Sequence, residues 1–75
     1  MITVEMVWLA IDNIAAERGM TPSGLARHCG LDATTFNKSK RHTAAGDDRC
    51  LCMSTVLRVL NTLDMTLADF ERYMR

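Results

Sequence analysis

Residues 21–41 read TPSGLARHCGLDATTFNKSKR and decide the fold of this 75-residue chain. Thr21 can cap a helix, and Pro22 suits the first helical position because the N–H that it lacks would find no partner there. An apolar stripe at helical spacing follows, formed by Leu25, Ala26 and Cys29. Gly30 then stands where the chain must leave the helix with a positive φ. The pattern predicts a short helix that ends in a tight turn.

A second helical pattern follows, and we expect it to run over residues 33–40, with the basic run ending at Arg41. Asp32 is a suitable N-cap, because its negative charge favours the positive end of the helix dipole. With Phe36 directed to the core, the helical repeat gathers four polar side chains on the outer side: Thr34, Asn37, Lys38 and Arg41. Two short helices joined by a tight turn predict a helix-turn-helix.

The outer face expected for residues 33–41 has two short polar side chains, two cations and no acid. Asparagine can bind adenine in a bidentate manner, lysine and arginine can bind guanine or phosphate, and threonine can touch a thymine methyl. We therefore expect a helix that reads the major groove through base contacts from Ala33, Thr34, Asn37 and Lys38. We expect phosphate contacts from Thr21, Ser23, Lys40 and Arg41. Spacing alone leaves open an ordinary solvated helix with a basic last turn.

The segment resembles the lambda-repressor-like (Xre-type) helix-turn-helix family, whose motif positions are occupied by Leu25, Ala26, Gly30, Leu31, Thr35 and Phe36. It is most similar to the N-terminal DNA-binding domains of LexA/CI-like repressors, which carry a self-cleaving peptidase domain. The residues that match the recurring motif of these domains are Leu25, Ala26, Gly30, Leu31, Asp32, Thr34, Phe36, Asn37, Ser39, Lys40 and Arg41. The resemblance extends from the helix of Trp8 to that of Phe70. It implies a compact five-helix, all-α domain and a DNA-binding transcriptional regulator, with a repressor expected.

The chain departs from that subfamily after the motif. A run containing Trp and Pro usually precedes the fourth helix there, whereas residues 49–53 read RCLCM here. The peptidase domain is also absent, so neither a catalytic Ser/Lys pair nor self-cleavage is carried over.

The rest of the chain reads as scaffold for a single domain over residues 1–75. A helix is expected over residues 3–18 with Trp8 in the core, and a loop over residues 42–52. A helix over residues 53–63 is expected to bury Val56, Leu57, Leu60 and Leu63. Thr66 should cap a last helix, with Asp69 completing a capping box.

Charge is balanced overall but uneven along the chain, with nine basic and nine acidic residues in total. Between Arg18 and Arg49, six basic residues stand against three acidic ones, and the remainder reverses that ratio. The basic half contains the helix-turn-helix, where phosphates are expected to bind. Because a lone small module binds weakly, we expect a homodimer on a palindromic operator of double-stranded DNA.

The sequence gives less support to other classes of function. Cys50 and Cys52, with Cys29, His28 and His42, raise the alternative of a thiol- or metal-responsive regulator, but their spacing matches no zinc finger. No metal or cofactor is expected. Enzymatic activity is not expected, because no nucleophile, base and orienting group can be grouped. A protein-binding module that uses the same helices stays open. No long apolar run or export signal is present, so a reducing cytoplasm is expected.

Overall fold

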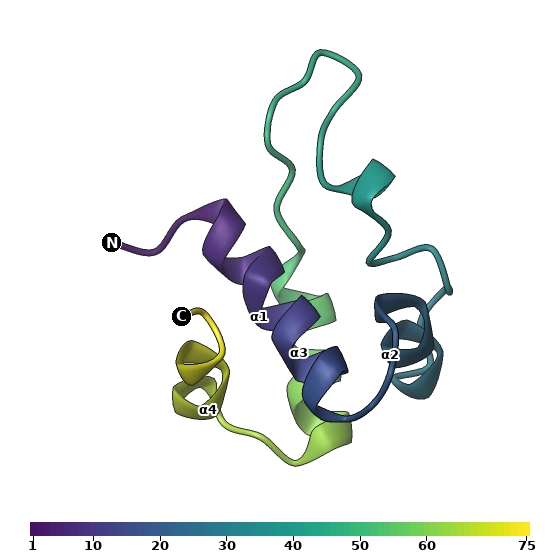
Figure 1. Cartoon of the computed structure of the whole chain (residues 1–75), viewed down its shortest axis with the longest axis vertical. Helices are drawn as coiled ribbons and strands as arrows, with labels where there is room; N and C mark the ends of the chain where they lie inside the picture. The colour runs from purple at the N-terminus through teal and green to yellow at the C-terminus, as the bar shows by residue number, and fades with distance from the viewer.

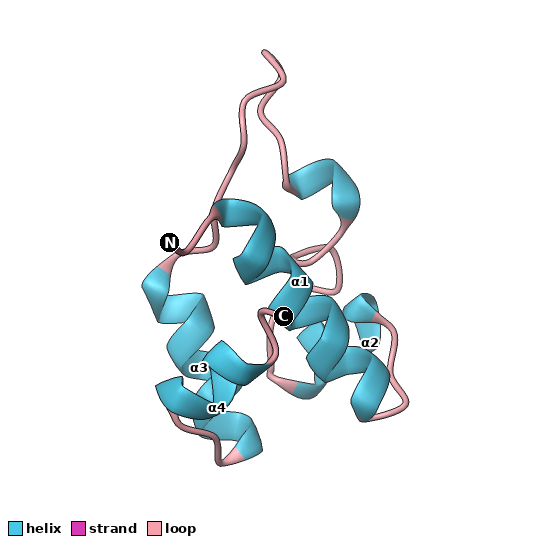
Figure 2. Ribbon diagram, turned by 60° about the vertical axis from the view of Figure 1, so that its left-hand side comes forward, coloured by secondary structure: helices cyan, strands magenta, loops and turns pink.

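The computed structural model describes residues 1–75 and contains four α-helices, a single 3-10 turn and no strand (Figure 2). The elements are α1 (Val4–Glu17), α2 (Pro22–His28), η1 (Lys38–Lys40), α3 (Met53–Leu63) and α4 (Leu67–Arg72). Helix α1 runs through the middle of the molecule, with α2 and α4 on either side of it and both chain ends on the α4 side (Figure 1). The all-helical prediction is confirmed. None of the helices combines the length and the apolar character needed to cross a membrane.

Side-chain caps fix where three of the helices begin. The hydroxyl of Thr3 accepts a hydrogen bond from the N–H of Met6, and that of Thr21 accepts one from the N–H of Gly24. Thr66 and Asp69 form a complete capping box at α4. Each cap satisfies a backbone donor that the helix itself leaves unpaired. The caps predicted at Thr21 and Thr66 are therefore confirmed.

The core consists of fifteen buried residues, and none of them is polar or charged. They are Trp8, Ala10, Ile11, Ile14, Ala15, Leu25, Ala26, Cys29, Phe36, Val56, Val59, Leu60, Leu63, Phe70 and Met74. The expected burial of Trp8 in α1 is confirmed, as are the stripe of α2 and the inward Phe36. Leu57 was placed in the core wrongly, because α3 instead buries the helically spaced set Val56, Val59, Leu60 and Leu63 and leaves Leu57 45% exposed.

The helix expected over residues 33–41 does not form, so the chain has four α-helices where five were expected. The segment makes two short turns, each closed by bonds between residues three apart: Thr35 N–H to Asp32 O, Asn37 to Thr34, Lys40 to Asn37 and Arg41 to Lys38. Asn37 lies between the turns in an extended conformation, with ψ of 148°. Thr, Phe, Asn and Ser all have low helix propensity, and Thr34 and Thr35 also bond to Asp32 instead of continuing a helix.

The loop predicted after this segment is confirmed, and it forms an arm that projects from the body (Figure 1). An isolated antiparallel bridge joins His42 to Asp48, and the N–H of Thr43 donates to the carbonyl of Asp47 at 2.8 Å. At its base, the N–H of Arg49 donates to the carbonyl of Arg41 at 2.9 Å. The arm is therefore a short hairpin-like loop with hydrogen bonds along its stem.

Candidate nucleic-acid interface

The candidate interface is built on residues 32–40, which we call the turn segment. It follows α2 directly and is held to the body by Phe36, whose side chain is fully buried. Gly30 permits the sharp exit from α2 with φ of 74°, as the sequence predicted. Leu31, half-buried, packs against the core at the corner. A tight turn and one aromatic anchor thus place the polar residues of the segment on the surface.

The predicted base-contacting residues lie on this segment, with differing freedom. Asn37 and Lys38 are exposed, and the Asn37 side chain makes no hydrogen bond to the turn that follows it. Ala33 is half-buried. The hydroxyl of Thr34 donates to Oδ1 of Asp32 at 2.7 Å, which leaves its oxygen free only as an acceptor. Asn37 and Lys38 are therefore the side chains freest to bind a base.

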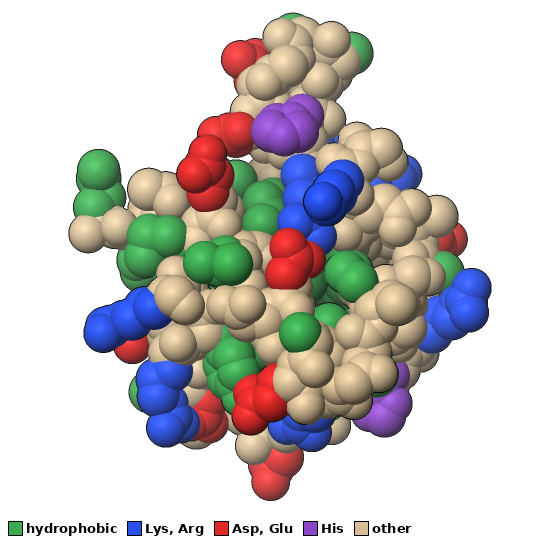
Figure 3. Space-filling view, viewed as in Figure 1, with side chains coloured by type: hydrophobic (Ala, Val, Ile, Leu, Met, Phe, Trp, Pro, Cys, Tyr) green, Lys and Arg blue, Asp and Glu red, His purple; other side chains and the backbone are tan.

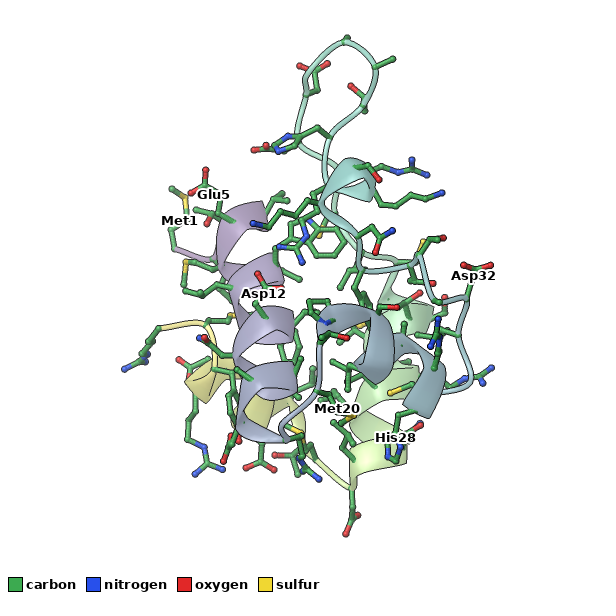
Figure 4. All side chains as sticks on the ribbon, turned by 45° about the vertical axis from the view of Figure 1, so that its right-hand side comes forward. Met1, Glu5, Asp12, Met20, His28 and Asp32 are labelled. Carbon is green, nitrogen blue, oxygen red and sulfur yellow. The ribbon has the colours of Figure 1, made fainter.

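Asp32 adds an acid to a surface that was expected to have none. Its carboxylate accepts from the Thr34 N–H at 2.9 Å as well as from the Thr34 hydroxyl. The backbone hydrogen bond from Thr34 is the main cause that lowers the pKa of Asp32, with the Thr34 hydroxyl and the charge of Lys40 acting in the same direction. The side chain is exposed at the outer edge of the segment (Figure 4). Asp32 therefore stays ionised at neutral pH and orders the first turn.

The predicted phosphate-contacting residues separate into two groups. Thr21 and Lys40 are exposed and Ser23 is half-buried, so their polar groups can be approached from solvent. The side chain of Arg41 is only 11% exposed, and the prediction that it lies on the outer face with Thr34, Asn37 and Lys38 is wrong. It points instead toward α1, because the strongest partner for its guanidinium lies there.

Arg41 is enclosed by contacts from two directions. Its two terminal nitrogens donate to the two oxygens of Asp12 at 2.8 and 2.7 Å, and one of them also donates to the carbonyl of Phe36 at 3.0 Å. The guanidinium lies over the ring of Trp8, 4.7 Å from its centre. Asp12, midway along α1, belongs to no predicted site (Figure 4). Helical spacing gave no signal for this pairing, because the partners are 29 positions apart.

The turn segment borders a cleft of about 360 Å³. It is lined by Asp32, Thr34, Thr35 and Lys40 of the turn segment, by residues 49–52 and Thr55, which we call the second wall, and by Trp8. The indole N–H of Trp8 donates to the carbonyl of Arg49 at 2.8 Å, which fixes that second wall to α1. Lys40 and Arg49 thus bring two cations to one cleft. Arg49 was not predicted as a site residue, since nothing in the local sequence places it beside the turn segment.

A further cation lies at the turn that follows α2. Nη1 of Arg58, from α3, is 3.3 Å from the position that a Cβ on Gly30 would take. Arg27 at the end of α2 is also exposed. Acidic and basic side chains are nevertheless interspersed over the face seen in Figure 3. The face seen in Figure 3 therefore offers local cationic contacts and no single large basic patch.

The cysteines do not form a metal site. Cys29 is buried, and burial is the main cause that raises the pKa of its thiol. Cys50 and Cys52 are exposed and line the cleft beside the turn segment. No group of three or more potential ligands from His, Cys, Asp and Glu comes together. The two exposed thiols stay accessible to reagents, without a third ligand beside them.

In a comparison with known protein families, residues 10–74 match the model of the Cro/C1-type HTH DNA-binding domain. The match spans α2 and the turn segment and most of the remaining helices. No curated protein and no solved structure shows a significant match to the chain.

Proposed function

Because the chain belongs to the family of Cro/C1-type HTH DNA-binding domains, and is thus a DNA-binding transcription regulator of the Xre-like kind, we propose that its turn segment reads the major groove of double-stranded DNA. The observation that carries the proposal is the exposure of Asn37 and Lys38 on a segment held against the core by Phe36. An amide and an ammonium presented in this way suit adenine and guanine edges. Ala33 and the hydroxyl oxygen of Thr34 lie on the same segment, within reach of neighbouring bases.

Phosphate binding is assigned to three residues around this segment: Thr21, Ser23 and Lys40. The hydroxyls of Thr21 and Ser23 stand at the start of α2, the helix that crosses the DNA backbone in helix-turn-helix proteins. Lys40 lies beyond Asn37 on the same segment, where its charge attracts a phosphate on either strand. Arg41 is left out of this set, because its two terminal nitrogens donate to Asp12 and Phe36 and its side chain is only 11% exposed.

We propose that the regulator acts as a repressor in the cytoplasm and binds a palindromic operator as a homodimer. Kinship with LexA/CI-like repressors is supported by the motif over residues 30–41. A single turn segment offers few base contacts, and a second copy doubles them on a symmetric site. The proposal includes no catalytic step.

Selection from a random pool of duplex DNA tests the proposal, with rounds at low and at near-physiological salt. We expect an enriched palindrome whose half-sites lie about 10 bp apart, centre to centre. An absence of enrichment, with binding lost as salt rises, would reduce the interaction to non-specific attraction and favour a protein-binding module.

Two substitutions then separate base reading from phosphate binding. Asn37→Ala should reduce discrimination at one base position by about 1–3 kcal/mol, whereas Lys40→Ala should weaken binding to all duplexes and flatten the salt slope by about one unit. Asn61→Ala on α3 truncates the same side chain type as Asn37→Ala, and Arg75→Ala at the C-terminus removes one positive charge as Lys40→Ala does; both positions are exposed and away from the turn segment. If the Asn37 and Lys40 variants bind like these controls, the assigned surface is wrong.

A further inference from the structure

The turn segment is anchored at two points, one on each side of the residues proposed to read bases. Phe36 enters the core immediately before Asn37. Arg41 follows Lys40 and is tied to α1 through the two oxygens of Asp12. Asn37 and Lys38 therefore lie between an apolar anchor and an ionic one.

Such anchors matter here because the segment is not an α-helix. In an α-helix the carbonyl of Phe36 would accept the N–H of Lys40, within a ladder that holds side chains in a fixed register. In this chain the Lys40 N–H donates to Asn37, and the guanidinium of Arg41 donates to the Phe36 carbonyl at 3.0 Å. The Arg41 side chain thus supplies the hydrogen bond that the Phe36 carbonyl would receive in a helix, and it links the two anchors to each other.

Arg41 also fixes the start of the projecting arm. Its N–H donates to Lys38 on the preceding turn, and its carbonyl accepts the N–H of Arg49 where the arm returns. The face of Trp8 covers the guanidinium, while the Trp8 indole N–H holds the Arg49 carbonyl. Arg41, held by Asp12 and Trp8 of α1, therefore fixes the point where the turn segment ends and the arm begins.

From these contacts we propose that Arg41, held by Asp12 and Trp8, is a positioning residue for DNA recognition that places Asn37 and Lys38 for base contact without touching DNA itself. The inference rests on the proposed major-groove reading by the turn segment. The surroundings of Arg41 support a role away from phosphate. Its own cleft, of about 280 Å³, is also lined by Glu5 and Asp48, whose charges repel a phosphate.

For the substitution Asp12→Asn, the proposal predicts a change in operator affinity opposite to the one expected from charge alone. Removing an acid from a DNA-binding protein should strengthen its attraction to phosphates, and freeing Arg41 to reach DNA would add to that gain. The positioning role predicts the reverse for the selected operator. We expect about tenfold weaker binding to the operator, the scale of one lost base contact, and unchanged or tighter binding to a scrambled duplex.

Arg41→Lys gives a second and independent readout. Lysine keeps the charge but has a single ammonium, which cannot pair with both Asp12 oxygens and the Phe36 carbonyl as the planar guanidinium does. We expect weaker binding to the operator alone, with an unchanged salt slope. A direct phosphate contact would survive this change, leaving the affinity for both duplexes close to that of the wild type.

Both variants should be measured by fluorescence anisotropy over a salt series, with Asp64→Asn and Arg72→Lys as matched controls at exposed positions. Trp8 is the only tryptophan, so its emission reports whether the guanidinium still covers it, and circular dichroism reports the fold. Weaker operator binding by folded variants, with scrambled-duplex binding and salt slope retained, supports the positioning role.

Wild-type affinity for the operator in either variant would overturn the positioning role, as would unfolding of both. Failure of the wild-type chain to prefer its selected operator over a scrambled duplex would instead overturn the proposed function, and is seen before any variant is made.

Discussion

Gly24 lies in α2 and Gly30 just after it, yet alanine at these two positions should change the stability of the fold in opposite directions. Gly30 has φ of 74°, which strains any side chain, so Gly30→Ala should destabilise the fold by about 1–2 kcal/mol. Gly24 lies inside α2, where an added Cβ would be 3.4 Å from Thr21 Oγ1, an ordinary contact. Gly24→Ala should stabilise the fold by about 0.5–1 kcal/mol. Urea unfolding followed by circular dichroism checks both, and equal stability of the two variants would contradict the backbone assignment.

Single residues were predictable where their partners are close in the sequence. The Thr21 hydroxyl caps α2 by accepting a hydrogen bond from Gly24, three residues further on, and Gly30 has the positive φ that the end of α2 requires. The inward turn of Arg41 was not predictable, because Asp12 and Trp8 lie in another helix and only the folded chain brings them together. An arginine that follows Lys38, Ser39 and Lys40 looks like a surface cation until its partner is known.

The same distinction separates the elements. Each α-helix has a strong apolar stripe or a cap, and the bounds of α1 and α3 differ by one residue at most from the predicted ranges 3–18 and 53–63. The turn segment has one buried residue, Phe36, which fits a helix and a pair of turns equally well. What decides between them is competition for backbone groups, because the side chains of Asp32, Thr35 and Arg41 form hydrogen bonds with backbone N–H or C=O groups of the segment.

The first turn of the turn segment should loosen in acid. The folded pKa of Asp32 is lowered by its hydrogen bonds from Thr34, so the stabilisation is fully present above the unfolded pKa and is lost as pH falls through the folded one. The Thr34 amide resonance should shift with a midpoint below the ordinary range of an aspartate. In Asp32→Asn, whose amide oxygen can still accept from Thr34, this transition should vanish. An acid transition of the Thr34 amide that persists in the variant would assign it to another group.

Charge at the level of the whole molecule favours a modest, local attraction to DNA. The basic excess of residues 18–49 is offset by the acidic remainder, and the projecting arm contains both Asp47 and Asp48. Phosphate attraction by a neutral chain depends on a few cations, such as Lys40 and Arg49 at the shared cleft. Under the proposed function, we therefore expect specific affinity to come largely from base contacts and from the pairing of two copies.

The size of the molecule sets the spacing at which two copies can meet on DNA. Its extents are 35 × 29 × 21 Å, and half-sites one helical turn apart are separated by about 34–36 Å. Two copies on one face of the duplex are thus just within reach of each other. We expect cooperative binding to half-sites about 10 bp apart, and independent binding when about 5 bp are inserted, because the second copy then faces the opposite side.

Inserting about 10 bp returns the second copy to the same side of the duplex but places it too far away for contact, so cooperativity should stay lost. Mobility-shift titrations of the three duplexes measure this directly. Cooperativity that returns at the longest spacing would show that the copies are joined by something other than contact between these two compact bodies.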